Sequence, residues 1–315
     1  MIVMPLIDLE KIREVSKVLT SVDIKPMDLY DTRFYPNKNE PLDRVFMYFI
    51  VMVAMDHRLS RPGKQYRAFI DGEELHGADL LYRLGMKMYN EKPEFFDPRN
   101  LIKIEPRDIV SWLTIGSATP PDPDVRALLL QDLGLKILKL FDGDPVNLLI
   151  VSENRLRKED GNGFLEILKI FKAYQDPVEK KGMLLAKFLS YRGILNIIDV
   201  YNKRVAVDNH LTRIAIRLGI VDLEKSYIEK IQNMIPIERE EDIVIRYSVR
   251  EAYRYLSEYS NVDPFHLDDI LWNLGRSICI KVKPLCEICY FKNVCRAYLE
   301  NVYLDEPMYF NTWYY

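Results

Sequence analysis

The four cysteines of this chain lie in one short segment near its C-terminal end and constrain the fold of that region. They are Cys279, Cys286, Cys289 and Cys295, in a C-x6-C-x2-C-x5-C pattern, and the 315-residue chain contains no other cysteine. Two disulfides in so short a segment would close small loops and add little stability, and nothing else in the chain indicates secretion. Four thiolates held together without disulfides require a cation, and both zinc and a cubane iron–sulfur cluster accept four Cys ligands.

The spacing of these cysteines bears on the choice between the two kinds of site. Structural zinc sites usually present two close Cys pairs, whereas this segment has one close pair, Cys286 and Cys289, with a longer loop on each side. The pattern resembles the 4Fe–4S loop of the endonuclease III-type DNA glycosylases. The resemblance implies a 4Fe–4S cluster bound by all four cysteines, with zinc as the alternative.

Size, charge and hydropathy set broad limits on the protein class. The chain is long enough to bury a large core in one large or two medium domains. Its formal net charge is −3, so binding to nucleic acid must come from a local basic patch. The longest apolar run, residues 46–55, is too short to span a bilayer, and the N-terminal residues lack the pattern of a signal peptide. We therefore expect a cytoplasmic protein, and its scarcity of glutamine is typical of thermophiles.

A long apolar segment in the N-terminal part of the chain ends in three polar residues. Residues 42–59 predict one long buried helix, and Asp56, His57 and Arg58 lie near its end. A carboxylate, an imidazole and a guanidinium at the end of an apolar helix form a candidate wall of a substrate pocket. The alternative is a helix end whose polar side chains are solvated.

Asp208 is the first candidate for a catalytic residue. It follows three apolar residues and precedes a helical pattern that Gly219 ends, so we expect it at a helix N-terminus, where the helix dipole favours its charge. Cleavage of a base–sugar bond passes through an oxocarbenium ion at C1′, and an ionised carboxylate beside C1′ stabilises that ion or activates water. The alternative is that Asp208 only caps the helix.

The residues around Asp208 resemble a known catalytic segment. Residues 205–219 read V-A-V-D-N-H-L-T-R-I-A-I-R-L-G and are similar to the V-D-T-H-x-x-R-x-x-x-R-L-G segment of the helix-hairpin-helix DNA glycosylase superfamily. In that family the Asp is the catalytic carboxylate, so the resemblance assigns this role to Asp208 and places His210 in the substrate pocket. The cysteine segment follows in the same order as in the family, and the similarity covers about residues 165–297.

The segment that corresponds to the family's hairpin departs from the family. A Pro-Gly-Val-Gly turn there binds a DNA phosphate through backbone N–H groups, whereas residues 175–181 read Q-D-P-V-E-K-K. No glycine is present for the tight turn, and two carboxylates stand where a phosphate would lie. We expect a helix that starts at residues 176–179, with Asp176 as its N-cap. Lys180 best matches the family's Schiff-base lysine, and Lys181 is the next match; the alternative is a solvated helix face.

A second resemblance covers more of the N-terminal region. Residues 66–72 predict a short strand followed by an Asp-Gly hairpin turn, and residues 76–82 predict the start of a helix. Together they are similar to a strand–turn–helix segment of the queuosine-salvage nucleotide N-glycosylases, and Asp56 also falls near a characteristic aspartate of that family. This resemblance adds His76 and Asp79 to the candidate pocket. It implies a modified ribonucleotide or nucleoside as an alternative substrate.

Four cationic residues surround the cysteines in the sequence. The iron–sulfur glycosylases place this loop against the DNA backbone, so the resemblance implies that these cations contact phosphates. The alternative is that they compensate the negative charge of a thiolate cluster. The four residues are Lys281, Lys283, Lys292 and Arg296.

These patterns predict a mainly α protein with a helix-hairpin-helix DNA glycosylase-like fold. We expect a C-terminal iron–sulfur loop and an N-terminal helical addition with a short β element, in three regions, residues 1–124, 125–262 and 263–315. The expected activity is hydrolysis of the base–sugar bond of a damaged or modified base in DNA, as in base excision repair. The alternatives are a modified ribonucleotide or nucleoside as substrate, and a non-catalytic nucleic-acid-binding iron–sulfur protein.

The cysteine pattern generates a prediction about metal content. Protein purified without oxygen should be brown, with a broad blue–violet absorbance and about four irons per chain. Metal analysis by mass spectrometry and the visible spectrum measure both. One zinc and no iron per chain would contradict the assignment.

Overall fold

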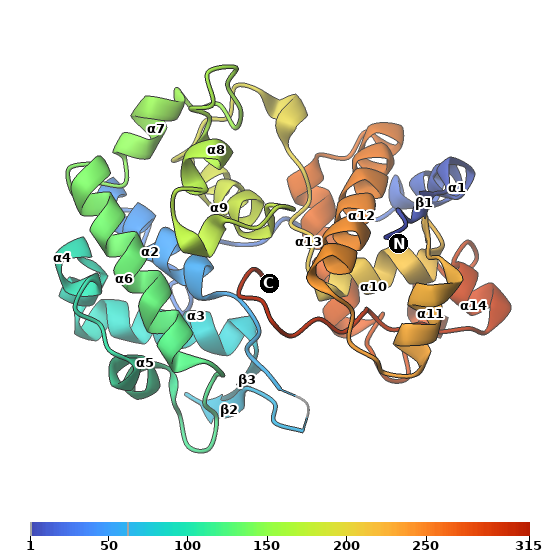
Figure 1. Cartoon of the computed structure of the whole chain (residues 1–315), viewed down its shortest axis with the longest axis horizontal. Coiled ribbons are helices and arrows are strands. Elements are labelled where there is room, and N and C mark those ends of the chain that lie inside the picture. Colours follow the sequence, from blue (N-terminus) through green and yellow to red (C-terminus); the bar gives the residue numbers. More distant parts are fainter. Residues whose placement is uncertain (1, 62) are drawn as a thin grey trace. The chain divides into compact units, whose positions relative to one another are not determined.

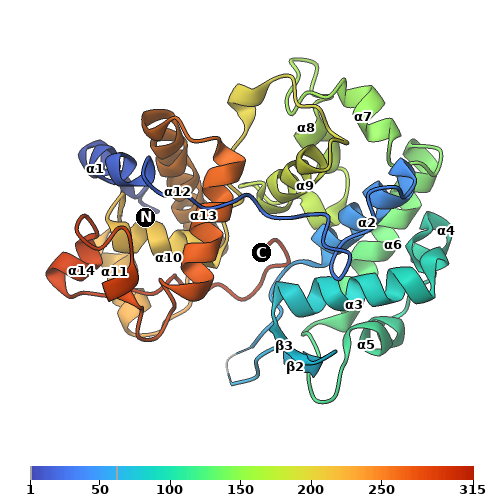
Figure 2. The same cartoon turned by 180° about the vertical axis from the view of Figure 1, so that it is seen from behind.

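The fold is mainly helical, and its elements are shown in Figure 1 and from behind in Figure 2. The structure is a computed structural model that describes residues 2–61 and 63–315. It divides into two compact units. Unit 1 comprises the residues up to Met27 together with Lys203–Thr312, and unit 2 comprises Asp28–Asn202 together with Trp313–Tyr315. The three regions expected from the sequence are defined by sequence pattern rather than by compactness, and they stay a prediction.

Helix α2 (Leu42–Met55) is the central element of unit 2. All of its residues from Val45 to Met55 are buried, because the helix is apolar on every side. It packs against α3 (Ala78–Glu91), α6 (Pro123–Leu140) and α9 (Lys180–Tyr191). The helix ends at Met55, four residues earlier than the sequence pattern predicts, because the next residue leaves helical geometry with φ −82° and ψ 75°.

A two-stranded hairpin precedes α3 and confirms the short β element expected in this region. Strand β2 (Arg67–Ile70) pairs antiparallel with β3 (Glu73–His76). The two turn residues between them, Asp71 and Gly72, have φ angles of 49° and 89°. A two-residue turn of this kind requires positive φ at both positions, which Asp and Gly tolerate.

Unit 1 is built around α12 (Arg239–Ser260). Helices α1 (Leu9–Leu19) and α13 (Pro264–Ser277) pack against it, and α10 (Asn209–Leu218) packs against both α12 and α13. Among the described residues, no helix is both long enough and apolar enough to cross a membrane.

Shorter elements complete the two units. Unit 2 also contains η1 (Pro93–Phe96), α4 (Pro98–Leu101), α5 (Pro106–Leu113), α7 (Asn147–Ser152), α8 (Phe164–Leu168), η2 (Lys172–Tyr174) and η3 (Val200–Asn202), where η denotes a 3-10 helix. Unit 1 also contains the antiparallel pair β1 (Leu6–Ile7) and β4 (Val221–Asp222), with α11 (Lys225–Gln232), η4 (Cys286–Ile288) and α14 (Arg296–Glu300).

Helix α9 begins later than the sequence pattern predicts. The helix expected from residues 176–179 starts at Lys180, because Pro177 and Val178 form a turn and Glu179 adopts a left-handed conformation with φ 64°. Asp176 is therefore the first residue of the turn and not the N-cap of the helix.

The last three residues of the chain pack in unit 2. The indole Nε1 of Trp313 donates to the carbonyl of Lys172 (3.0 Å), and the backbone N–H of Arg58 donates to the carbonyl of Tyr315 (3.2 Å). The segment that precedes them belongs to unit 1. The chain thus enters unit 2 a second time at its C-terminal end.

Candidate functional site

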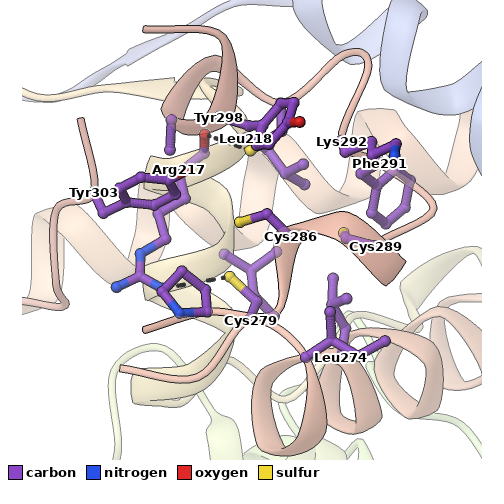
Figure 3. A pocket seen from close by; sticks show the side chains of 15 residues that line it. Arg217, Leu218, Leu274, Cys279, Cys286, Cys289, Phe291, Lys292, Tyr298 and Tyr303 are labelled. Carbon is purple, nitrogen blue, oxygen red and sulfur yellow. Dashed lines mark hydrogen bonds between the residues drawn. The ribbon is translucent and has the colours of Figure 1, made fainter. Parts of the chain in front are cut away.

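The four cysteines line one pocket in unit 1. Figure 3 shows Cys279, Cys286 and Cys289 around this space, and Cys295 also lines it. All four are half-buried and none forms a disulfide. The remaining wall is mostly apolar and aromatic. The structure therefore brings together the whole set of cysteines singled out in the sequence.

The donor set of this pocket is four cysteine sulfurs, which both zinc and a 4Fe–4S cluster accept as ligands. A zinc ion with Zn–S bonds of about 2.3 Å would hold its ligand sulfurs within about 4 Å of one another. Within the described residues, no three His, Cys, Asp or Glu side chains are arranged to hold a single ion. Burial raises the pKa of Cys289 to about 11 and also raises the pKa of Cys295. A cation in the pocket would offset this cost and favour the thiolates.

Arg217 of α10 connects the cysteine segment to the rest of unit 1. Its guanidinium donates to the carbonyls of Ile280 (2.8 Å), Lys281 (3.0 Å) and Leu304 (2.7 Å), and it lies 3.6 Å from the sulfur of Cys279. Its side chain also pairs with Asp305 at 3.0 Å. One buried side chain thus satisfies three backbone carbonyls of irregular segments, which have no partners in a helix or sheet.

Arg213, one turn earlier on α10, has a similar role. It donates to the carbonyls of Cys279 (3.0 Å) and Gly275 (2.9 Å) and pairs with Glu306 at 2.8 Å. Both arginines are 2 % exposed. The segment that contains the first cysteine is therefore held by two guanidinium groups from a single helix.

Asp208 caps the N-terminus of the same helix, as the sequence predicts. Its side chain accepts a hydrogen bond from the backbone N–H of Leu211 (3.0 Å), and the residue is half-buried. His210 follows in the first turn, with its Nδ1 3.0 Å from Arg213 Nη2. The pKa of His210 is lowered by burial, and the nearby Asp208 carboxylate offsets part of this effect. Only glycine fits beside this histidine, because a Cβ on Gly275 would lie 2.8 Å from the Cβ of His210.

In unit 2, the C-terminal end of α2 is surrounded by cationic side chains. Arg126 of α6 is fully buried and donates to the carbonyls of Met55 (2.6 Å), His57 (2.8 Å) and Arg58 (2.8 Å). Lys181 of α9 donates to the carbonyl of Ala54 (2.6 Å). The last carbonyls of a helix have no partners within the helix and lie at the negative end of its dipole. Helix α2 has no basic residue in its own last turn. Arg126 and Lys181 therefore supply the hydrogen-bond donors and the positive charge that its C-terminal end lacks.

Lys180 and His57 belong to the same cluster. Lys180 Nζ donates to the carbonyl of Asp56 (3.1 Å) and lies 3.6 Å from its carboxylate. Lys181 Nζ lies 3.1 Å from His57 Nδ1, and the Nε2 atom of His57 is buried without a hydrogen-bond partner among the described residues. Burial holds the pKa of Lys181 and of His57 well below their usual values. A neutral amine is the nucleophilic form of lysine.

Burial overturns two of the simpler interpretations of these residues. The exposed fraction is 6 % for Lys180, 0 % for Lys181 and 3 % for His57. The two lysines therefore do not lie on a solvated helix face, and His57 is not a solvated helix end. The physical reason is that α2 ends inside the protein, where its carbonyls require buried donors.

The other expected pocket residues are distributed over both units. Arg58 follows directly after the cluster in unit 2, while His76 ends β3 and Asp79 lies in the first turn of α3, also in unit 2. Asp208 and His210 lie in unit 1. The structure therefore brings Asp56 and His57 together with the two lysines, and Asp208 together with His210.

Three of the four cations near the cysteines form ion pairs. Lys281 pairs with Glu306 (3.3 Å), Lys292 pairs with Glu287 (3.5 Å), and Arg296 pairs with Asp222. Lys283 is exposed and has no carboxylate partner in the part of the chain that the structure describes. These pairs lower the positive charge that the loop presents.

Arg126, Arg213 and Arg217 were not among the candidate site residues expected from the sequence. Each is an arginine within an otherwise apolar helical face, and such a residue is buried only when its donors are satisfied. That signal was available for the two arginines of α10, which lie four residues apart on one face. Their acceptors are backbone carbonyls, which every residue has, so the sequence does not show which residues these arginines contact.

The contacts of Arg217 generate a prediction about stability. Arg217→Met keeps an apolar stem but leaves three carbonyls and the Asp305 carboxylate without this partner, so the free energy of unfolding should fall by about 3 kcal/mol. Urea denaturation measures this change. The matched control is Arg239→Met, at the exposed first residue of α12, which should change stability by no more than about 0.5 kcal/mol. Equal effects would contradict the assigned role.

Comparisons with known proteins bear on the fold. No protein-family model and no curated protein matches the chain. Solved structures do match it. A trapped covalent intermediate of endonuclease III with DNA is 13 % identical, with 94 % of this chain and 99 % of that chain covered and a TM-score of 0.52. A thermostable thymine-DNA glycosylase is 14 % identical, with 92 % and 98 % covered and a TM-score of 0.50. The chain thus has the mainly helical fold of the helix-hairpin-helix DNA glycosylases.

Proposed function

We propose that this protein is an N-glycosylase that hydrolyses the base–sugar bond at C1′, with Asp208 as its essential carboxylate. The observation that carries the proposal is the position of Asp208, half-buried at the N-terminus of α10, on the helix that also holds the cysteine segment. A helix N-terminus is a favourable place for a negative charge, because the helix dipole has its positive end there. An ionised carboxylate beside C1′ stabilises the oxocarbenium ion or activates the attacking water.

We further propose that the four cysteines hold a 4Fe–4S cluster with a structural role. Support comes from their gathering around one pocket whose donor set fits such a group. Because four Cys fill all four iron positions, none remains for a substrate. Arg213 and Arg217 tie this segment to the helix that carries Asp208, so the cluster would stabilise the surroundings of the carboxylate.

Lys180 and Lys181 are proposed as the residues that would add lyase chemistry. Burial favours the neutral form of Lys181, which a Schiff-base nucleophile requires. Both amines, however, donate to carbonyls at the end of α2. Formation of a Schiff base would therefore require one of these hydrogen bonds to break, and Lys180, the less buried of the two, is the more accessible amine.

We propose DNA as the first candidate substrate and a free modified nucleotide as the second. The fold supports DNA, because both solved structures described above are of proteins that act on DNA or are bound to it. The ion pairs of the cysteine loop favour the modified nucleotide, because they leave few free cations to bind DNA phosphates. Of the four cations near the cysteines in the described residues, Lys283 alone has no carboxylate partner. A non-catalytic nucleic-acid-binding protein is the remaining alternative.

The role of Asp208 is tested by Asp208→Asn. The amide still caps α10, so the free energy of unfolding should change by at most about 1 kcal/mol. Loss of the charge should lower base release about a hundredfold or more. The assay is a screen of lesion-bearing duplexes and free modified nucleotides. Asp263→Asn, at the N-cap of α13 in the same unit, is the control and should retain activity. Near-normal turnover by Asp208→Asn would reduce Asp208 to a helix cap.

The two candidate substrates differ in how strongly the binding affinity depends on salt. A protein that binds DNA through several phosphates loses affinity steeply as salt rises, whereas a nucleotide offers at most a few phosphate charges. We expect a salt-dependent affinity for duplex DNA that weakens when Lys281, Lys283 and Lys292 are changed together to Ser. Fluorescence anisotropy at several salt concentrations measures both effects. A flat salt response, with hydrolysis of a nucleotide and none of a lesion duplex, would favour the second candidate substrate.

A further inference from the structure

We propose that Asp176 is a specificity-determining residue, whose carboxylate takes the place of a phosphate at the N-terminus of α9 and excludes a nucleic-acid backbone from it. The inference rests on the proposed function in that the substrate is a nucleic-acid base. It adds a restriction on substrate binding, because it implies that this turn does not bind a backbone phosphate of the substrate.

The carboxylate of Asp176 occupies the donors that an external anion would use. Its Oδ1 accepts the N–H of Val178 (3.0 Å), and its Oδ2 accepts the N–H of Lys180 (2.9 Å). The N–H of Glu179, between them, donates to the backbone carbonyl of Asp176 (3.0 Å). The turn residue Pro177 has no N–H. The N–H groups of Val178, Glu179 and Lys180 are thus bound to the chain itself.

Burial and charge also oppose an external anion at this turn. Asp176 is 0 % exposed, so a phosphate could reach these N–H groups only by displacing a buried carboxylate. Glu179 adds a second carboxylate and is 3 % exposed. A helix N-terminus otherwise attracts phosphate through its N–H groups and its dipole. Here the carboxylate of Asp176 accepts two of these N–H groups and places its own negative charge at the N-terminus of α9.

The conformation of Glu179 shows how the turn is maintained. Its φ of 64° is a left-handed conformation that glycine adopts without cost and other residues adopt rarely. Ion pairs to Arg157 and to Lys169 (2.8 Å) hold its side chain. Arg157 and Lys169 are therefore engaged by Glu179, which leaves these two cations less able to attract a phosphate.

The experiment compares two buried aspartates of unit 2. Asp176→Asn removes the charge and leaves one acceptor oxygen, so one of the two N–H groups is released. Asp199→Asn is the matched control, because Asp199 is 1 % exposed and accepts the N–H groups of Leu156 (2.7 Å) and Arg157 (3.0 Å). Affinity for a short duplex oligonucleotide is measured by anisotropy at several salt concentrations, with thermal melting as a check on folding.

We expect Asp176→Asn to bind the duplex about three- to tenfold more tightly than wild type at low salt. The slope of log affinity against log salt should steepen by about 0.9, the value for one added phosphate contact. Asp199→Asn should match wild type in both quantities. An Asp176→Asn protein that is folded and binds the duplex with unchanged affinity and slope would overturn the proposal.

A second measurement uses the wild-type protein and does not depend on a folded variant. In protein labelled with ¹⁵N-valine and ¹⁵N-lysine, the amide signals of Val178 and Lys180 should not shift when inorganic sulfate or the duplex is added. Shifts of both signals with sulfate would overturn the proposal. Because sulfate carries no base, this result stands whether or not the protein proves to be a glycosylase, and the Asp208→Asn assay decides that separately.

Discussion

The hydrogen bonds from Arg213 and Arg217 to backbone carbonyls are the interactions on which the candidate site of unit 1 depends. Irregular segments expose carbonyl groups that no helix or sheet satisfies, and burying them without partners is costly. A guanidinium offers five donors in a fixed arrangement, so one arginine can satisfy several carbonyls at once. Because both arginines belong to α10, the helix that positions Asp208 also positions the cysteines.

Unit 2 uses cations in a related way at the end of α2. This helix is apolar throughout and ends inside the protein, so its last carbonyls require donors from elsewhere in the chain. Arg126, Lys180 and Lys181 supply them. The two lysines that resemble catalytic residues are therefore also structural, and a substitution of either will affect stability as well as chemistry. Stability must be measured alongside activity whenever these lysines are tested.

Much of this architecture could be predicted from the sequence, because the signals were local. The apolar run of α2, the Asp-Gly turn after β2 and the capping position of Asp208 each follow from a few neighbouring residues. The gathering of the cysteines followed from their spacing. The burial of Lys180 and Lys181 could not be predicted, because it depends on the carbonyls of a helix more than a hundred residues away. The ion pairs of Lys281 and Arg296 likewise depend on partners that are distant in the sequence.

The path of the chain through its two units has a consequence for folding. Residues 28–202 form an insertion within unit 1, and Trp313–Tyr315 return to the inserted unit. Unit 1 therefore forms only when segments on either side of a long loop meet, and closing such a loop costs conformational entropy. Contacts of this kind have high sequence separation, which slows folding. Neither unit is one contiguous stretch, so no single cut divides the chain into two fragments that each hold one unit alone.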